Sequence, residues 1–180
     1  MKLYTERLIL RPWQESDAND LYEYAKDERV GPIAGWPPHK SVEESRSIIK
    51  TMFMRDEVYA VALKEDNRAI GLIGLSMQAD SQLPIGKNDA EISYWIGVPF
   101  WGRGLIPEAV REIIRHGFAD LKLENLWSGY FQGNLQSKAV QEKCGLTHYG
   151  TLEPKYMELI GETKIEEISR ITYQEWKNRT

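Results

Sequence analysis

The stretch from Ala90 to Ala109, AEISYWIGVPFWGRGLIPEA, constrains the fold of this chain more than any other part of it. Its first half, Glu91 to Val98, alternates apolar and polar side chains, and this period of two predicts a strand. From Arg103 or Gly104 onward, apolar residues recur every three or four positions as far as Leu121, which predicts a helix. We therefore expect the strand to pass into the helix with almost no loop between them.

The connection itself, Phe100 to Gly104, contains two glycines separated by a single residue. A strand that enters a helix through closely spaced glycines exposes backbone N–H groups at the positive end of the helix dipole. Such a row of N–H groups binds anions, and in a small domain the expected anion is a phosphate. The same Gly-x-Gly spacing is also common in plain tight turns, so the pattern alone leaves both interpretations open.

The residues around the connection favour the phosphate interpretation. The stretch AEISYWIG…WGRGLIPEA resembles motif A of the GNAT superfamily of N-acetyltransferases, in particular the branch with the ribosomal-protein N-terminal (alanine/serine) acetyltransferases. The resemblance extends over nearly the whole chain, from TERLILRPW through NLQSKAVQEKCGL to the closing YQEW. The family pattern begins with Gln or Arg where this chain has Pro99. Because proline has no N–H to donate, we expect this position to act by shape.

The resemblance implies that acetyl-CoA is the co-substrate. In the family, the loop of motif A holds the pyrophosphate, and a backbone N–H from the end of the strand polarises the thioester carbonyl. A second motif, after the long helix, supplies contacts with the pantetheine arm. The implied cofactor-binding residues are Trp95, Ile96, Gly97, Val98, Trp101, Gly102, Arg103, Gly104, Leu105, Ile106, Asn134 and Ser137.

The second motif is Asn134-x-x-Ser137, which opens a short predicted helix. Taken structurally, Asn134 caps this helix, Gly145 ends it, and Leu135 and Cys144 lie on its apolar stripe. Asn134 and Ser137 are one turn apart at the helix N-terminus, so both side chains can face one ligand. The family resemblance places Asn134 on the pantetheine arm and Ser137 beside the sulfur. Cys144 is expected to be a buried hydrophobe rather than a nucleophile.

The implied chemistry is acyl transfer to an amine, which must be neutral when it attacks. A free α-amine titrates near about 7.7–8.0, so at neutral pH it needs only modest help from a base. Glu91, on the same strand face as Ser93 and Trp95, is the candidate base, acting through a water molecule. The alternative role for Glu91 is a salt bridge that holds the strand register. Ser137 is the candidate acid for the leaving thiolate, directly or by relay.

The whole chain, residues 1–180, is expected to form one α+β domain of the GNAT type. The expected sheet is central, twisted, mixed and mostly antiparallel, with about seven strands and about four flanking helices. Alternating patterns predict strands over 3–13, 58–63, 69–77, 91–98, 126–131, 146–152 and 163–173. Capping residues and helical spacing predict helices over about 17–29, 41–55, 104–121 and 134–145.

A proline-rich loop over residues 31–40, GPIAGWPPHK, separates the first two predicted helices. Its position is similar to that of the family's substrate-side lip, so Trp36 and His39 are candidate acceptor-binding residues. Trp36 is equally compatible with a role in closing the core. Within the predicted strand at 69–77, Gly71 and Gly74 indicate a bulge or the close approach of another backbone.

Composition limits the classes of partner. The chain has 27 acidic and 23 basic residues, and this net charge of -4 gives no electrostatic case for nucleic acid. It contains no apolar run of the ~18–20 residues that a membrane span needs and no signal peptide, so a membrane is not an expected partner. The single cysteine is compatible with a reducing cytoplasm, which is the expected location. His39, His116 and His148 show no metal-ligand spacing, so no metal is expected.

Three functions remain after these exclusions. The first is an N-acetyltransferase that moves an acetyl group from acetyl-CoA to a primary amine, at a protein N-terminus or on a small molecule. The second is a non-catalytic coenzyme A sensor or interaction module of the same fold. The third is an unrelated nucleotide-phosphate binder, although a Walker lysine after Gly104 and the third glycine of a dinucleotide site are both absent. The acceptor stays open, as does the oligomeric state, including a homodimer.

Overall fold

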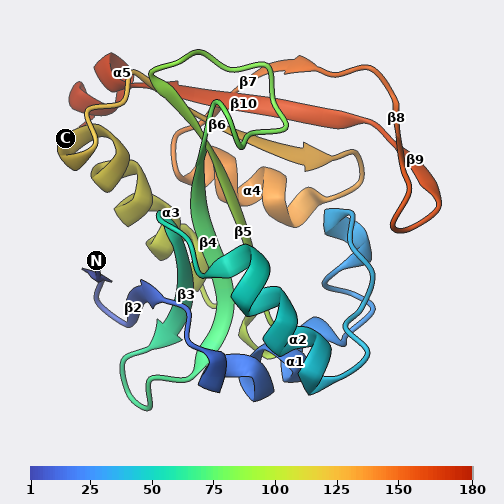
Figure 1. Cartoon of the computed structure of the whole chain (residues 1–180). Coiled ribbons are helices and arrows are strands. Elements are labelled where there is room, and N and C mark those ends of the chain that lie inside the picture. The colour runs from blue at the N-terminus through green and yellow to red at the C-terminus, as the bar shows by residue number, and fades with distance from the viewer. Residues whose placement is uncertain (180) are drawn as a thin grey trace. The chain divides into compact units, whose positions relative to one another are not determined.

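The computed structural model describes residues 1–179, and their contacts divide them between two compact units. Unit 1 comprises Met1–Gly74 and Tyr94–Ala109, and unit 2 comprises Leu75–Ser93 and the chain from Val110 onward. Three elements contribute residues to both units: the strands β4 (Ala69–Met77) and β5 (Asp89–Ile96) and the helix α3 (Leu105–Arg115), all labelled in Figure 1.

Unit 1 contains antiparallel strands in the order β1-β2-β3-β4 and two helices that pack against each other. β3 is buried along its whole length because its sequence, VYAVAL, offers apolar or aromatic side chains on both faces. The elements of this unit are β1 (Leu3–Tyr4), β2 (Leu8–Pro12), α1 (Ala18–Ala25), α2 (Val42–Ile48) and β3 (Val58–Leu63).

The core of unit 1 joins side chains from its helices to side chains from its strands. This contact explains why the helices pack on the sheet, since each element buries its apolar face against the other. The cluster consists of Trp13, Ala18, Leu21, Ala25, Ile49, Val58, Ala60, Ala69 and Leu72.

Gly71 in β4 allows the backbone of β5 to come unusually close. A Cβ atom at this position would lie 2.3 Å from the carbonyl oxygen of Trp95 and 2.9 Å from the Cα atom of Ile96. No larger residue fits there without displacing β5. The close backbone approach that the sequence predicts for this glycine is therefore confirmed.

The predicted elements of unit 1 differ from the structure mainly at their ends. The strand expected over 3–13 is interrupted because Thr5 forms a turn, in which its amide donates to Leu8 O at 3.1 Å and its hydroxyl accepts from Leu8 N at 3.0 Å. The first helix ends at Ala25, before the expected 29. The second is α-helical only to Ile48 and continues as a π-helical turn over Ile49–Phe53.

Unit 2 contains the parallel pair that makes the sheet mixed. β6 (Asn125–Phe131) pairs in parallel with β5 and antiparallel with β10 (Glu166–Thr172), which in turn pairs antiparallel with β7 (Thr147–Thr151). A parallel pair requires a crossover connection, and α3 lies in that connection. The helix α4 (Leu135–Lys143) packs against β6.

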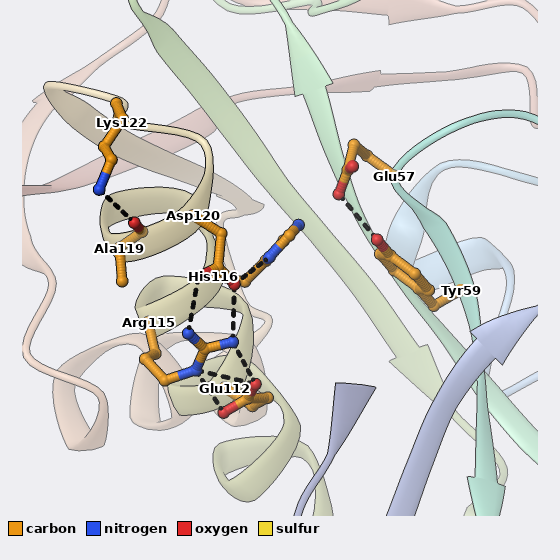
Figure 2. Close-up of polar contacts among 8 residues, drawn as sticks. All are labelled: Glu57, Tyr59, Glu112, Arg115, His116, Ala119, Asp120 and Lys122. Atoms are coloured by element: carbon orange, nitrogen blue, oxygen red, sulfur yellow. Dashed lines mark hydrogen bonds and ion pairs between the residues drawn. The ribbon is translucent and has the colours of Figure 1, made fainter. Parts of the chain in front are cut away.

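The end of α3 is held by charged side chains, which Figure 2 shows. The helix continues beyond Arg115 as a π-helical turn, His116–Asp120. Asp120 forms an ion pair with Arg115 at 2.9 Å and lies 2.8 Å from Nδ1 of His116, and Arg115 also contacts Glu112 at 2.8 Å. The hydrogen bonds from Arg115 and His116 lower the pKa of Asp120 to about 2. Asp120 therefore stays ionised and fixes this turn at neutral pH.

The expected α+β fold, with a mixed and mostly antiparallel sheet, is confirmed. Among residues 1–179 the sheet has eight strands instead of about seven, in the order β1-β2-β3-β4-β5-β6-β10-β7. β8 (Lys155–Met157) and β9 (Glu162–Lys164) form a separate hairpin, and β9 occupies the start of the strand expected over 163–173. The residues YQEW form a short helix, α5 (Tyr173–Lys177), because Thr172 and Glu175 make a capping box.

Candidate active site

The loop of motif A lies in unit 1 and requires glycine at two positions. The chain leaves β5, forms a 3-10 turn over Val98–Phe100, and then enters α3 through Gly102 and Gly104. These glycines have φ angles of +71° and +73°, in the left-handed region that favours glycine. A Cβ atom on Gly102 would meet nothing within 4 Å, and one on Gly104 would meet only Arg7 Nη2 at 3.7 Å. The backbone conformation requires glycine here, and the side of the loop where a Cβ would project is open.

The backbone N–H groups of this loop are oriented for an anion. No described residue accepts a hydrogen bond from the amides of Gly102 through Ile106. The helical pattern starts where Glu108 N donates to Gly104 O at 3.2 Å. Consecutive unpaired N–H groups at a helix N-terminus form a cradle for phosphate. The predicted row is shorter by one, because the amide of Trp101 donates to Val98 O at 3.1 Å.

Arg7 connects the β1–β2 turn to this loop. Its Nη1 donates to the carbonyl oxygen of Arg103 at 3.0 Å, and its Nε pairs with Glu108 at 2.7 Å. Glu108 also accepts from the amide of Arg7 and from Thr5 Oγ1. Partial burial would raise the pKa of Glu108, but these hydrogen bonds lower it. The loop is thus fixed by an ionised network, and sequence reasoning missed Arg7 because its partners lie about a hundred residues away.

The end of β5, Trp95–Val98, offers fewer N–H groups than expected. The amide of Gly97 donates to Ile70 O at 2.9 Å, so this group is not available to polarise a thioester carbonyl. The indole Nε1 of Trp101 donates to the carbonyl oxygen of the last β5 residue at 2.9 Å. Within the described residues, the amide of Val98 has no such partner. Val98 therefore replaces Gly97 as the candidate donor in this run.

The predicted acceptor-binding residues belong to unit 1 and make many internal contacts. Trp36 is half-buried, packs against the core of the unit, and lies edge-on to Trp95 with ring centroids 5.7 Å apart. His39 is buried, its Nδ1 is 2.8 Å from Ser45 Oγ, and burial lowers its pKa. These contacts favour a structural role for His39. An acceptor contact for either residue stays a prediction.

Asn134 and Ser137 lie in unit 2, at the start of α4. The Oδ1 atom of Asn134 accepts from Ser137 N at 3.1 Å, so Asn134 is a true N-cap. The predicted apolar stripe is wrong at Leu135, whose side chain is 71% exposed. The helix is instead held by Gln141, which donates to Ser128 Oγ at 3.0 Å. Cys144 is partly buried, and burial raises the pKa of its thiol to about 11, which agrees with a non-nucleophilic role.

Glu91 lies on β5 opposite Trp127 of β6, also within unit 2. Its carboxylate accepts from Ser81 Oγ at 2.7 Å and from Gln82 N at 3.2 Å. These bonds attach the 78–88 loop to β5. The alternative role predicted for Glu91 was a salt bridge that holds the strand register. The observed bonds are also structural, but their partners are neutral, and Glu91 has no salt bridge within residues 1–179.

A second carboxylate, Glu166 at the start of β10, was not predicted from the sequence. It lies against Gly129 of β6, where a Cβ atom would be 1.9 Å from Glu166 Oε1. Burial, followed by the negative charge of Glu91, raises the pKa of Glu166 to about 7. Nothing in the local sequence distinguishes Glu166 from Glu167. The one available signal was the glycine within the predicted strand at 126–131, since such a glycine indicates the close approach of another group.

The part of the chain that the structure describes contains no helix that is long and apolar enough to cross a membrane. No group of three His, Cys, Asp or Glu side chains among residues 1–179 could hold a metal ion.

Comparison with known proteins gives consistent matches. The family model described as "Acetyltransferase (GNAT) domain" matches residues 7–147. A relative from Bacillus licheniformis, "Uncharacterized N-acetyltransferase p20", is 32% identical over 129 residues, which cover 69% of this chain and 70% of the relative.

Two solved structures are similar over almost their whole length. A GNAT-family acetyltransferase from Bacillus anthracis superimposes with a TM-score of 0.83 and 22% identity, covering 97% of this chain and 99% of that one. A putative ribosomal-protein-serine acetyltransferase from Vibrio cholerae superimposes with a TM-score of 0.77 and 21% identity, covering 96% and 97%. At these identities the likeness establishes the fold alone.

Proposed function

This chain belongs to the GNAT acetyltransferase family, and we propose that it transfers an acetyl group from acetyl-CoA to a primary amine by direct attack in a ternary complex. The observation that carries this proposal is the row of unpaired amides from Gly102 to Ile106 at the N-terminus of α3. A pyrophosphate is the anion that such a cradle fits, and Arg103 and Arg7 add positive charge beside it.

The other cofactor contacts are proposed separately for each unit. In unit 1, Val98 N–H is the proposed donor to the thioester carbonyl, with Trp95, Ile96 and Gly97 shaping the strand end. In unit 2, Asn134 uses Oδ1 for the helix cap, and within the described residues its Nδ2 has no partner, so Nδ2 can donate to a carbonyl of the pantetheine arm. Ser137, at the next turn, is the proposed acid for the leaving thiolate.

The reaction needs a neutral amine and a route for one proton. An α-amine is about one-tenth neutral at pH 7, so positioning and carbonyl polarisation supply most of the acceleration. Glu91 acting through water is the candidate base from the sequence. Trp36 is proposed to contact the acceptor, and His39, whose ring centroid is 5.5 Å from that of Trp36, is proposed to support it.

A protein N-terminus is the proposed acceptor class. The similar Vibrio cholerae structure is described as a putative ribosomal-protein-serine acetyltransferase, which supports this class without excluding small amines. The second candidate is a non-catalytic coenzyme A-binding module of the same fold. The hydrogen bonds that tie Glu91 to Ser81 and Gln82 favour this candidate, because they give the carboxylate a structural task.

The test is release of free thiol from acetyl-CoA with a panel of amines. The panel contains peptides with N-terminal Ser or Ala, the same peptides with blocked N-termini, free amino acids and polyamines. We expect thiol release with open N-termini and none with the blocked controls. Binding of acetyl-CoA without thiol release from any amine would favour the non-catalytic module, and failure to bind acetyl-CoA would refute both candidates.

A further inference from the structure

We propose that Glu166 is the general base that takes the proton of the acceptor amine, a role that sequence reasoning gives to Glu91. The inference rests on the proposed acetyl transfer, and it depends on where the two carboxylates lie within unit 2.

The strand register places Glu166 next to Gly129 of β6, where there is no side chain. It is the first residue of β10 and pairs with Phe131, so it shares a face of the sheet with Gly129 and Ile168. Its carboxylate occupies the place that a side chain at position 129 would take, with Oε1 only 1.9 Å from an added Cβ. Glycine at 129 is therefore what admits the carboxylate to this face.

The same region is where β6 and β5 stop pairing. Their parallel register covers only Asp89–Glu91 with Asn125–Trp127, although β6 continues to Phe131. The next link is made by a side chain, because Ser128 Oγ donates to the carbonyl oxygen of Ile92 at 2.9 Å. Glu166 thus lies beside a part of β6 that has no backbone partner from β5 within the register.

The carboxylate of Glu166 has no hydrogen-bond donor among the described residues. The donors around it serve other groups: Ser81 Oγ and Gln82 N bond Glu91, and Lys155 Nζ donates to Gln82 Oε1 at 3.4 Å. A half-buried carboxylate without donors is costly to ionise, and such groups are concentrated at functional sites.

Its surroundings bring the titration of Glu166 close to neutral pH. Burial beside the apolar cluster of Leu83, Ile85, Trp127 and Ile168 is the main cause, and the charge of Glu91 on β5 adds to it. Lys155 on β8 acts in the opposite direction, and the facing residues of β6, Gly129 and Phe131, carry no charge. The resulting pKa of Glu166 is raised to about 7, the range that suits a general base at neutral pH.

The proton balance of the step is simple. The amine nitrogen attacks the thioester carbonyl carbon, an N–C bond forms, and the C–S bond breaks. Before the attack, a protonated amine loses one proton to solvent. On attack the nitrogen loses a second proton to Glu166, which releases it to solvent. The departing sulfur takes one proton from Ser137, the proposed acid, and solvent restores the proton of Ser137. A protonated amine and acetyl-CoA thus give an acetamide, free coenzyme A and one released proton.

Glu167 provides a matched control on the next residue of the same strand. It faces the opposite side, pairs with Tyr130, and accepts from Gln132 Nε2 and Thr151 Oγ1, both at 2.7 Å. Those hydrogen bonds lower its pKa. Replacement of Glu167 by Gln removes the same charge from the same strand without touching Glu166.

The experiment is the pH dependence of acetyl transfer in the wild type and in the variants Glu166→Gln, Glu167→Gln and Glu91→Gln, with one N-terminal peptide as acceptor. The acceptor's own ionisation is common to all four, so differences report the protein. We expect Glu166→Gln to lose about 10–10³-fold in kcat and the acidic limb near pH 7. Glu167→Gln should match the wild type. Glu91→Gln should keep the acidic limb and move it to lower pH, because a like charge beside Glu166 is removed.

A stability measurement gives a readout that does not depend on turnover. A carboxylate whose pKa is raised from 4.5 to about 7 binds more protons in the folded than in the unfolded state between these pH values, so it costs stability as pH rises through this window. Glu166→Gln should therefore melt above the wild type at pH 8 and with it at pH 4.

Each contrary outcome has a distinct meaning. A Glu166→Gln protein with the wild-type kcat and acidic limb would overturn the assignment, as would a Glu91→Gln protein that loses the limb altogether, since Glu91 would then be the base. A wild type that releases no thiol with any amine would refute the proposed function and the base with it. In that case a melting temperature of Glu166→Gln above that of the wild type at pH 8 would still show that the ionised, buried carboxylate of Glu166 costs stability.

Discussion

At the scale of single residues, the loop at the start of α3 is held open by its own backbone and by Arg7. Gly102 and Gly104 take left-handed φ angles, and the guanidinium of Arg7 bridges the carbonyl of Arg103 and the carboxylate of Glu108. The loop therefore has its binding conformation before an anion binds to the free amides. A preformed site loses little conformational entropy on binding, and this raises its affinity.

Arg7→Ala should weaken acetyl-CoA binding while leaving kcat almost unchanged. The variant loses one hydrogen bond to the loop and one nearby positive charge, so we expect the Kd to rise about 3–10-fold, or ~0.7–1.4 kcal/mol. Lys50→Ala is the control, because Lys50 is an exposed cation of the same unit that pairs with Glu15 at 2.9 Å. Equal Kd values for the two variants, measured by calorimetric titration, would remove Arg7 from the site.

The site residues differ in how far the sequence alone predicted them. The glycines of motif A stand in a strand–loop–helix pattern of adjacent residues, and local geometry decides their φ angles. Glu166 depends on the register of β10 against β6, which no local pattern encodes. For the same reason the occupied amides of Gly97 and Trp101 were assigned to the cofactor, since their partners become visible only after the chain folds.

At the scale of elements, Asn134 of α4 combines an observed helix cap with a proposed contact to the cofactor. Oδ1 of Asn134 satisfies the amide of Ser137, and α4 buries little else besides Gln141. The N-cap bond is therefore one of the few contacts that fix the start of this helix. Its exposed Leu135 also shows why helical spacing alone overestimated the apolar stripe: spacing gives the face of a residue but not whether another element covers that face.

Asn134→Asp and Asn134→Ala separate the two tasks of this residue. Asp keeps the capping oxygen, so its free energy of unfolding should stay close to that of the wild type, whereas Ala should lose about 1 kcal/mol. Both remove Nδ2, so both should weaken acetyl-CoA binding if that atom contacts the pantetheine arm. Wild-type affinity in a fully stable Asn134→Asp protein would leave Asn134 a cap and nothing more.

Element boundaries were predicted less well than element types. β3 and β4 have the expected limits, because each is a nearly continuous apolar run, and the turn around Asp66 and Asn67 separates the two runs. The π-helical turns after α2 and α3 were not expected. The turn after α3 includes the contacts of Arg115 and His116 with Asp120, which helical spacing does not encode. The β8–β9 hairpin was missed because each of its strands is only three residues long.

At the scale of the whole molecule, the two compact units share three elements. β4, β5 and α3 each contribute residues to both units, so neither unit can unfold completely without disrupting a strand or helix of the other. The prediction of one domain over residues 1–180 was made from the sequence, and this sharing is compatible with it. A single domain implies cooperative unfolding, which can be measured.

Scanning calorimetry of the full chain should give one unfolding transition, with a calorimetric enthalpy close to the van't Hoff enthalpy. Intrinsic tryptophan fluorescence and far-ultraviolet circular dichroism should give the same midpoint, because tryptophans occur in both units. Two resolved transitions, or midpoints that differ between the probes, would contradict the single-domain prediction.

The most direct test of the central claim is a calorimetric titration of acetyl-CoA into the wild type and into Gly104→Val and Gly161→Val. Both glycines have positive φ, +73° and +68°, so both variants carry similar backbone strain, but Gly161 lies in the β8–β9 turn, outside motif A. We predict that the wild type and Gly161→Val bind acetyl-CoA equally well and that folded Gly104→Val binds at least about tenfold more weakly, ~1.4 kcal/mol. Equal affinity in all three proteins would contradict the assignment of the loop between β5 and α3 as the pyrophosphate site.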